Sequence, residues 1–246
     1  MENIIKPYII DFANRSFRDV ADQDYIAARA SYRLELDQQF LWSSLQAIEK
    51  YFKAILLYNG ISSKGINHNL AEALKRVEKI EDINFHLPED VIDFVNYINT
   101  YGPNRYLEFP SHLSMDALIE LDKTVWHIRR YCYFLRATLK SYDGTLVFLL
   151  PYELQKIHHE YYLENPHKYK ISGGFLEKAT SNKKICHKAL VWNNFYFGKK
   201  KRIYIKNFNS RTSSVNPTLT LHPESFEELD GLVYFSSETR KIFKQS

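Results

Sequence analysis

The sequence predicts two parts of different fold class: an antiparallel helical bundle over residues 1–144 and a smaller α+β domain over residues 145–246. Apolar residues recur at helical spacing through the first part, and this pattern changes after the turn-like stretch SYDG at 141–144. The formal charge also changes sign. Residues 1–150 carry 17 Lys and Arg against 20 Asp and Glu, whereas residues 151–246 carry 16 against 9. A basic part of this kind favours a polyanionic partner.

Composition narrows the class of protein further. Of the 246 residues, 45% are hydrophobic and 15% are aromatic, which is enough for a buried core and argues against disorder. Two cysteines make no disulfide framework. The N-terminal stretch has acidic residues and Pro7 where a signal sequence needs a basic start and an apolar run. We therefore expect a soluble cytoplasmic protein with no membrane contact.

Five amphipathic helices are predicted in the N-terminal part. The clearest begins at Asp37, where apolar residues are spaced alternately four and three apart, and it ends before Gly60, which suits a left-handed C-terminal position. Asp22, Asp37, either Asn67 or Asn69, and Ser114 are candidate N-caps. The predicted helices cover 21–36, 37–60, 67–80, 87–102 and 114–140. Short connections between them favour antiparallel packing.

The C-terminal part mixes patterns. Residues 151–164 read as one helix opened by Pro151, and residues 189–208 alternate apolar and polar side chains around Gly198, which predicts a hairpin. Short strands are expected at TLTL (218–221) and LVYF (232–235), with helices at 223–229 and 238–243. No internal repeat is visible.

Arginine and histidine stand close together in the stretch NRYLEFPSH at residues 104–112. The two residue types together suggest a phosphate-handling pair, and the alternative is a polar loop that happens to contain both. Pro110 forbids a continuous helix between them.

Three segments together resemble the HEPN domain (higher eukaryotes and prokaryotes nucleotide-binding). They are DQDYIAARASYRLELDQQFLWSSLQAIEKYFKAILLYNGI, then INHNLAEALKRV, then NRYLEF before a long helix, and the resemblance covers residues 15–140. It implies a helical bundle that forms homodimers and, in catalytic members, metal-independent RNA cleavage by an arginine and a histidine separated by four to six residues. Arg105 and His112 are separated by six, with Asn104 and Tyr106 as supporting residues.

The resemblance also implies a role for each residue of the pair. Metal-free RNA cleavage requires the ribose 2′-OH to attack its own phosphate, and an imidazole titrates near enough to neutrality to take or give that proton. A guanidinium offers permanently charged donors to the phosphorane oxygens. By this resemblance His112 is a candidate general base or acid, and Arg105 a candidate charge stabiliser.

The resemblance leaves a second function open. Family members without the catalytic pair act as non-catalytic modules that bind a nucleotide or a partner protein, including antitoxins. Catalytic members carry a small polar residue directly after the arginine, where this chain has Tyr106. The arginine can also belong to the architecture at the start of a helix.

A basic cluster is the strongest candidate for RNA contact outside that motif. It consists of Lys199, Lys200, Lys201 and Arg202, with aromatic residues on both sides, and no acidic residue occurs between Ala179 and Arg211. Cations bind phosphates and flat rings stack on unpaired bases. The alternative is a hairpin whose rings form a sheet core and whose lysines keep the tip solvated.

We expect structural roles for the remaining titratable residues. The spacing of the C-terminal histidines and Cys186 matches no closed zinc pattern, so we expect no metal and no cofactor. His68 and His127 read as structural. Arg29 and Arg33 lie one turn apart near Glu35, which is typical of a solvated helix face. The sequence as a whole favours an RNA-cleaving toxin or defence effector, with the non-catalytic module as the alternative. A third possibility is that the basic region is a DNA-contacting element.

Overall fold

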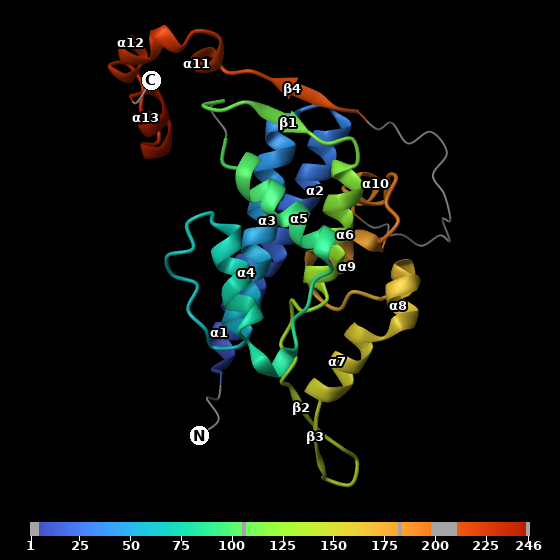
Figure 1. The fold of residues 1–246 in the computed structure, drawn as a ribbon. Coiled ribbons are helices and arrows are strands. Elements are labelled where there is room, and N and C mark those ends of the chain that lie inside the picture. The colour runs from blue at the N-terminus through green and yellow to red at the C-terminus, as the bar shows by residue number, and fades with distance from the viewer. Residues whose placement is uncertain (1–4, 105–106, 182–183, 198–210, 245–246) are drawn as a thin grey trace.

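The computed structural model describes residues 5–104, 107–181, 184–197 and 211–244. A long N-terminal helical stretch consists of α1 (Pro7–Phe12), the π-helical turns η1 (Ala13–Arg18) and α2 (Asp19–Arg33). The following elements are α3 (Asp37–Tyr58), α4 (Leu70–Glu78), η2 (Glu81–Ile83), α5 (Glu89–Tyr101), β1 (Ser111–Leu113) and α6 (Ala117–Arg129). The prediction of a mainly helical N-terminal part is confirmed (Figure 1).

Helix α3 is the centre of the core. It lies among α2, α4, α5 and α6 (Figure 1), and 13 of its 22 residues are buried. A helix that is buried on nearly every side needs apolar residues around most of its circumference, and Leu41, Leu45 and Ile48 are all fully buried. Gly60 follows α3 with a φ of +69°, as its predicted left-handed position requires.

The predicted N-caps are only partly correct. Asn69 does cap α4, accepting a hydrogen bond from the backbone N–H of Glu72 at 2.9 Å. Asp22 lies inside α2, and the last long helix begins at Ala117, not near Ser114. Asp37 is the first residue of α3, and its carboxylate binds residues far along the chain.

The helix predicted over 114–140 is shorter than its apolar pattern. Helix α6 ends at Arg129, and residues 138–140 form the strand β2 (Thr138–Lys140). Strand β2 pairs antiparallel with β3 (Leu146–Phe148), and the turn-like SYDG connects them. Cys132 and Leu135 remain buried, because the chain beyond α6 still packs on the core. The apolar spacing therefore predicted correctly that these residues are buried, but it did not predict that the helix ends at Arg129.

The chain after β3 forms short helices. These are α7 (Leu150–His158), α8 (Glu160–Glu164), η3 (Pro166–Lys168), α9 (Gly174–Thr180), α10 (His187–Val191), α11 (Thr218–Leu221), η4 (Pro223–Ser225), α12 (Phe226–Asp230) and α13 (Ser237–Phe243). The helix predicted over 151–164 is interrupted at His159, whose backbone is extended and whose imidazole caps α8. The helices predicted at 223–229 and 238–243 correspond to η4 with α12 and to α13.

The strand predictions in this part are wrong. TLTL forms α11, LVYF is not a strand, and residues 189–197 of the expected hairpin form the end of α10 and turns. The rest of that hairpin, residues 198–208, lies outside the described residues. Beyond it, the chain forms the strand β4 (Ser213–Val215), which was not predicted. Strand β4 pairs with β1 across the end of α2 and α3 (Figure 1). An alternating pattern of side chains over only four residues does not distinguish a strand from a short helix.

Two hydrophobic clusters hold the described chain together. The larger one includes residues from α2–α6 and also Ile157, Leu176 and Leu190 from the C-terminal half. The smaller one consists of Leu219, Phe226 and Phe235 and belongs to the C-terminal helices, which are set to one side in Figure 1. The domain boundary between residues 144 and 145 stays a prediction, and the larger cluster contains residues from both sides of it.

Candidate functional site

His112 occupies the middle of β1, immediately before the turn into α6. Ser111 and Leu113 on either side are buried whereas His112 is exposed, because successive side chains of a strand point to opposite faces. The hydroxyl of Tyr97 in α5 donates a hydrogen bond to the carbonyl oxygen of His112 at 2.6 Å. Buried Leu113 and this bond fix the backbone, so the imidazole is presented to solvent from a defined position.

The imidazole itself is held from the C-terminal part of the chain. The register of β1 and β4 places Ser214 directly opposite His112, and the Nδ1 of His112 lies 2.9 Å from the Oγ of Ser214. Among the described residues, the Nε2 of His112 has no hydrogen-bond partner. Within the described part of the chain, one ring nitrogen is therefore engaged and the side chain is exposed.

Asn104 closes the loop that precedes β1. Its Nδ2 donates to the carbonyl oxygen of Phe109 at 2.6 Å, and its Oδ1 accepts from the Phe109 N–H at 3.3 Å. As Pro110 predicts, residues 107–113 contain no helix. Arg105 and Tyr106 stand between Asn104 and Phe109 in the sequence but lie outside the described residues, so the pairing of Arg105 with His112 stays a prediction.

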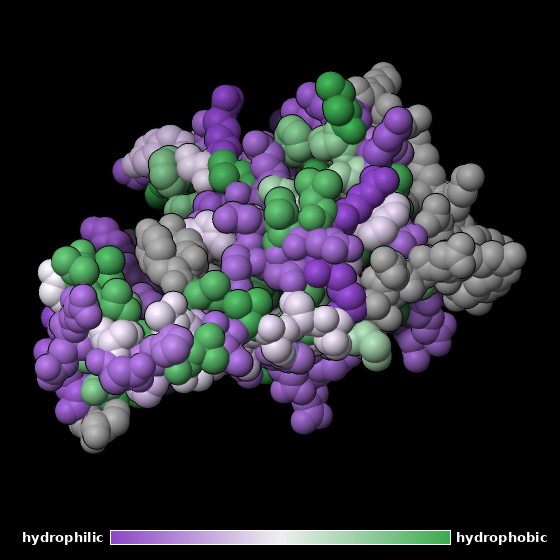
Figure 2. Space-filling model, turned by 90° about the horizontal axis from the view of Figure 1, so that it is seen from above, coloured by the Kyte–Doolittle hydropathy of each residue, from purple (hydrophilic) through white to green (hydrophobic). Residues whose placement is uncertain are grey.

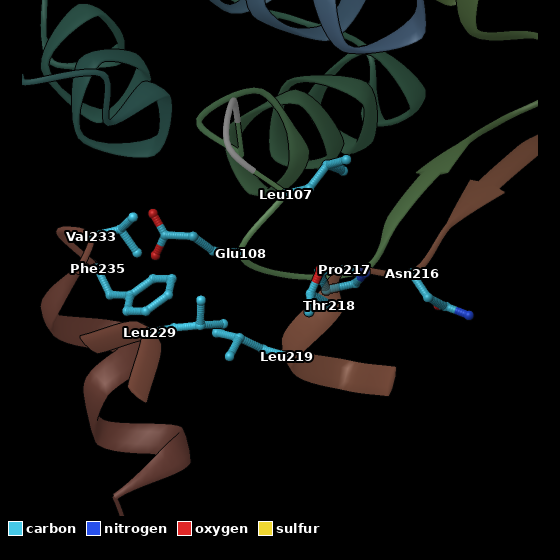
Figure 3. Close-up of a pocket in the computed structure, with 9 residues that line it drawn as sticks. All are labelled: Leu107, Glu108, Asn216, Pro217, Thr218, Leu219, Leu229, Val233 and Phe235. Atoms are coloured by element: carbon cyan, nitrogen blue, oxygen red, sulfur yellow. The ribbon is translucent and has the colours of Figure 1, made fainter. Parts of the chain in front are cut away.

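Glu108 joins the same loop to α13. Its carboxylate accepts hydrogen bonds from the Ser236 N–H at 3.1 Å and from the Thr239 hydroxyl. Partial burial by itself raises the pKa of Glu108, but the bonds from Thr239 and Ser236 outweigh it and lower the pKa below its ordinary value. A pocket of about 300 Å³ lies beside this contact, between Leu107 on the loop and the apolar side chains of the C-terminal helices (Figure 3).

A second anchor lies at the other end of β4. The carboxylate of Asp37 accepts hydrogen bonds from the Arg211 guanidinium, with Nη1 at 3.2 Å, and from the Ser213 hydroxyl. Arg211 also donates to the carbonyl oxygen of Tyr32 at 3.3 Å and lies over the Tyr32 ring. We call residues 211–215 the C-terminal strap. Figure 2 looks down on this end of the molecule, where apolar and polar side chains are interspersed.

Two buried ion pairs hold α2, α6 and the segment around α9 and α10 together. Asp22 accepts from Arg129 Nε at 2.8 Å, and both side chains are fully buried. Burial by itself lowers the pKa of Arg129, but the Asp22 carboxylate outweighs it and raises the pKa. Arg29 pairs in the same way with Asp122 and donates to the Ala189 carbonyl at 3.1 Å. The interpretation of Arg29 as a solvated residue is wrong, although Arg33 is exposed.

Gly174 allows the approach of the α9 segment to the Asp22–Arg129 pair. A Cβ at this position would lie 2.6 Å from Nη2 of Arg129, and its φ of +82° is left-handed. The Leu176 N–H donates to Asp22 Oδ2 at 2.8 Å, and Arg129 Nη2 donates to the Gly173 carbonyl at 2.8 Å. These contacts are structural because no charged atom of the pair reaches solvent.

His127 is a buried histidine of α6. Its Nδ1 accepts from Arg130 Nη2 at 3.2 Å, and Arg130 stacks on the Trp126 ring with its guanidinium carbon 3.7 Å from the ring centroid. Burial, with Arg130 and Lys123 nearby, lowers the pKa of His127 from 6.5 to about 3. His127 is therefore neutral in the folded protein, which fits the structural role predicted for it.

Acidification is expected to destabilise the protein through His127. Because the folded pKa lies below the unfolded one, the unfolded chain binds the extra proton, and stability is lost as the pH falls from about 6.5 toward 3. Between pH 7 and pH 5 the loss attributable to His127 is about 2 kcal/mol. Urea denaturation at both pH values, for the protein and for His127→Gln, measures it. Carboxylates titrate equally in both proteins, so equal losses would exclude His127.

The basic cluster predicted to bind RNA consists of Lys199, Lys200, Lys201 and Arg202. These residues lie outside the described ones, so their contact with RNA stays a prediction.

Within the described ranges, no group of three or more His, Cys, Asp or Glu side chains is arranged to hold a metal ion. In the same ranges, no helix is both long and apolar enough to cross a membrane.

Several residues at this site escape prediction from the sequence. Ser214, Asp37 and Glu108 form their contacts across more than 100 residues of chain. The sequence predicted Asp37 only as an N-cap, which gives no sign of its contacts with Arg211 and Ser213. Ser214 carries no signal either, because it stands in a serine-rich stretch with no apolar alternation.

Residues 15–128 match the family model of the HEPN domain, as the resemblance indicates. This match supports a helical nucleotide-binding or RNase-type module in general. The match includes Arg105 and His112 and ends before the strap. No curated protein and no solved structure matches the chain at a significant level.

Proposed function

We propose that this protein binds single-stranded RNA and cleaves it without a metal ion, with His112 as the proton-transfer residue and Arg105 as the charge stabiliser. The observation that carries the proposal is the state of His112: its backbone and Nδ1 are held, its side chain is exposed, and its Nε2 has no hydrogen-bond partner among the described residues. A general acid or base needs this combination of fixed position and one open nitrogen.

The reaction requires two proton transfers, one from the ribose 2′-OH and one to the departing 5′-oxygen. A base removes the proton of the ribose 2′-OH, whose oxygen forms a bond to the adjacent phosphorus while the bond from phosphorus to the 5′-oxygen breaks. The departing 5′-oxygen takes up a proton, which leaves a 2′,3′-cyclic phosphate and a 5′-hydroxyl. Arg105 carries a permanent positive charge for the phosphorane oxygens. A homodimer supplies two imidazoles, one for each proton transfer.

The charge of the C-terminal part supports RNA as the substrate. Residues 151–246 carry seven more basic than acidic residues, and such an excess attracts a phosphate backbone. In this proposal Lys199, Lys200, Lys201 and Arg202 bind the strand beside the cleavage site. Cleavage of RNA in a cell has to be controlled. The proposal therefore includes a toxin or defence role with an antitoxin partner.

The purified protein is expected to cleave single-stranded RNA in excess EDTA and to leave 2′,3′-cyclic phosphate ends. The mechanism predicts these ends because the 2′-oxygen is the nucleophile. Mass spectrometry of the fragments identifies the termini. A matched substrate with a single 2′-deoxyribose at the cleaved position should stay intact. Products with 5′-phosphate ends, or cleavage that EDTA abolishes, would contradict the proposal.

A second candidate function is a non-catalytic module that binds a nucleotide or a partner protein and regulates it. It is favoured by two contacts with the C-terminal part. Glu108 binds Ser236, and β1 pairs with β4. Contacts of this kind suit a binding surface. RNA that binds tightly in the same assay and remains uncut over long incubation supports this candidate.

A further inference from the structure

The C-terminal strap lies against the candidate site although it is remote in the sequence. Strand β4 pairs with β1 in a defined register, with Ser213, Ser214 and Val215 opposite Leu113, His112 and Ser111. Residues that are directly opposite in an antiparallel pair share a face of the sheet. Ser214 and His112 therefore point to the same exposed side, and the 2.9 Å contact between Oγ and Nδ1 follows from this register.

Two anchors define that register. At one end, Asp37 at the start of α3 binds Arg211 and Ser213. At the other end, Glu108 binds Ser236 and Thr239 at the start of α13. A slip by one residue would turn Ser214 to the opposite face, and it would also separate Ser213 from Asp37. The anchors thus place one particular hydroxyl opposite His112.

A strap over a candidate site can either block the site or complete it. Blocking requires the strap to cover the reactive nitrogen or to bury the imidazole. Here the strap contacts Nδ1 only, Nε2 has no partner among the described residues, and the His112 side chain remains exposed. The geometry therefore fits completion of the site.

We propose that Ser214 is a positioning residue for His112, so that the C-terminal part outside the HEPN domain completes the RNA-cleaving site. The inference rests on the proposed function. A hydroxyl can donate to a neutral Nδ1 or accept from a protonated one, so Ser214 holds the ring through both protonation states of the catalytic cycle. Ser214 itself does not transfer the proton to RNA.

Ser214→Ala is expected to lower kcat about 5- to 10-fold with KM unchanged, as expected when one neutral hydrogen bond that orients a catalytic group is lost. Ser214→Thr keeps the hydroxyl and is expected to restore most of the rate. Ser225→Ala is the matched control, because its hydroxyl donates to the His222 carbonyl within the same C-terminal part. That variant should cleave at the rate of the unchanged protein.

Nitrogen NMR of the His112 ring provides a readout that is independent of cleavage. The Nδ1 signal is expected to shift in Ser214→Ala and to stay in place in Ser214→Thr and Ser225→Ala. If the unchanged protein cleaves no RNA but the ring signals shift in this way, the proposed function fails and the positioning contact stands. Unaltered ring signals in Ser214→Ala, or a rise in its cleavage rate, would overturn the positioning proposal.

Discussion

His112→Ala is expected to lower the rate of RNA cleavage by about 10²- to 10⁴-fold, which is the usual contribution of a general acid or base. The side chain is exposed, and within the described ranges its side-chain hydrogen bond goes to the exposed Ser214, so the folded structure should tolerate its loss. Surface substitutions change stability by about 0.5 kcal/mol or less. Initial rates on a labelled RNA, together with thermal unfolding of both proteins, measure the two effects separately.

His222→Ala is the matched control for this prediction. His222 is an exposed histidine of the C-terminal part, and its nearest charged neighbour is Glu224, with Nδ1 3.3 Å from the carboxylate. This variant should keep the full cleavage rate. His112→Gln retains polarity but cannot transfer a proton, so it should be as inactive as His112→Ala. Cleavage that survives both substitutions at 112 would remove this residue from the mechanism.

The helices of the N-terminal part could be predicted because their cause is local. Apolar spacing marks the buried side of α3, and Asn69 caps α4 through a residue only three positions away. The roles of Asp22 and Arg29 could not be predicted in this way. The local sequence predicts Asp22 as an N-cap and Arg29 as a solvated residue, yet each pairs with a residue of α6 about 100 positions later. Charge burial depends on the partner, which local sequence does not reveal.

The candidate site likewise combines features that the local sequence predicts with features that depend on distant residues. The exposure of His112 follows from its place between two buried strand residues, and the absence of a helix follows from Pro110. The contact with Ser214 depends on a strand pairing across 102 residues. Asp37 of α3 binds Ser213 of this pairing, and Glu108 binds the chain beyond it at Ser236. A motif of nine residues can thus suggest the chemistry, while the geometry comes from distant parts of the chain.

Asp22→Asn is expected to destabilise the protein by about 3–5 kcal/mol, because it leaves the Arg129 charge buried without its counter-charge. The substitution hardly changes the shape of the side chain, so the loss measures charge and not packing. Such a loss is a large fraction of the 5–15 kcal/mol that usually stabilises a domain. The midpoint of urea denaturation measures it, and amide hydrogen exchange at Leu176 should rise because its N–H donates to Asp22.

The control for this prediction is Asp11→Asn, which removes a carboxylate from the exposed pair with Arg15. Its denaturation midpoint should not change, because exposed pairs contribute little. Asp22→Leu combined with Arg129→Met removes both buried charges and should recover part of the lost stability. The recovery is incomplete because the Tyr51 hydroxyl and the Leu176 N–H also bind Asp22. If Asp22→Asn proves no more harmful than Asp11→Asn, the buried pair does not hold the α9 segment on the HEPN domain.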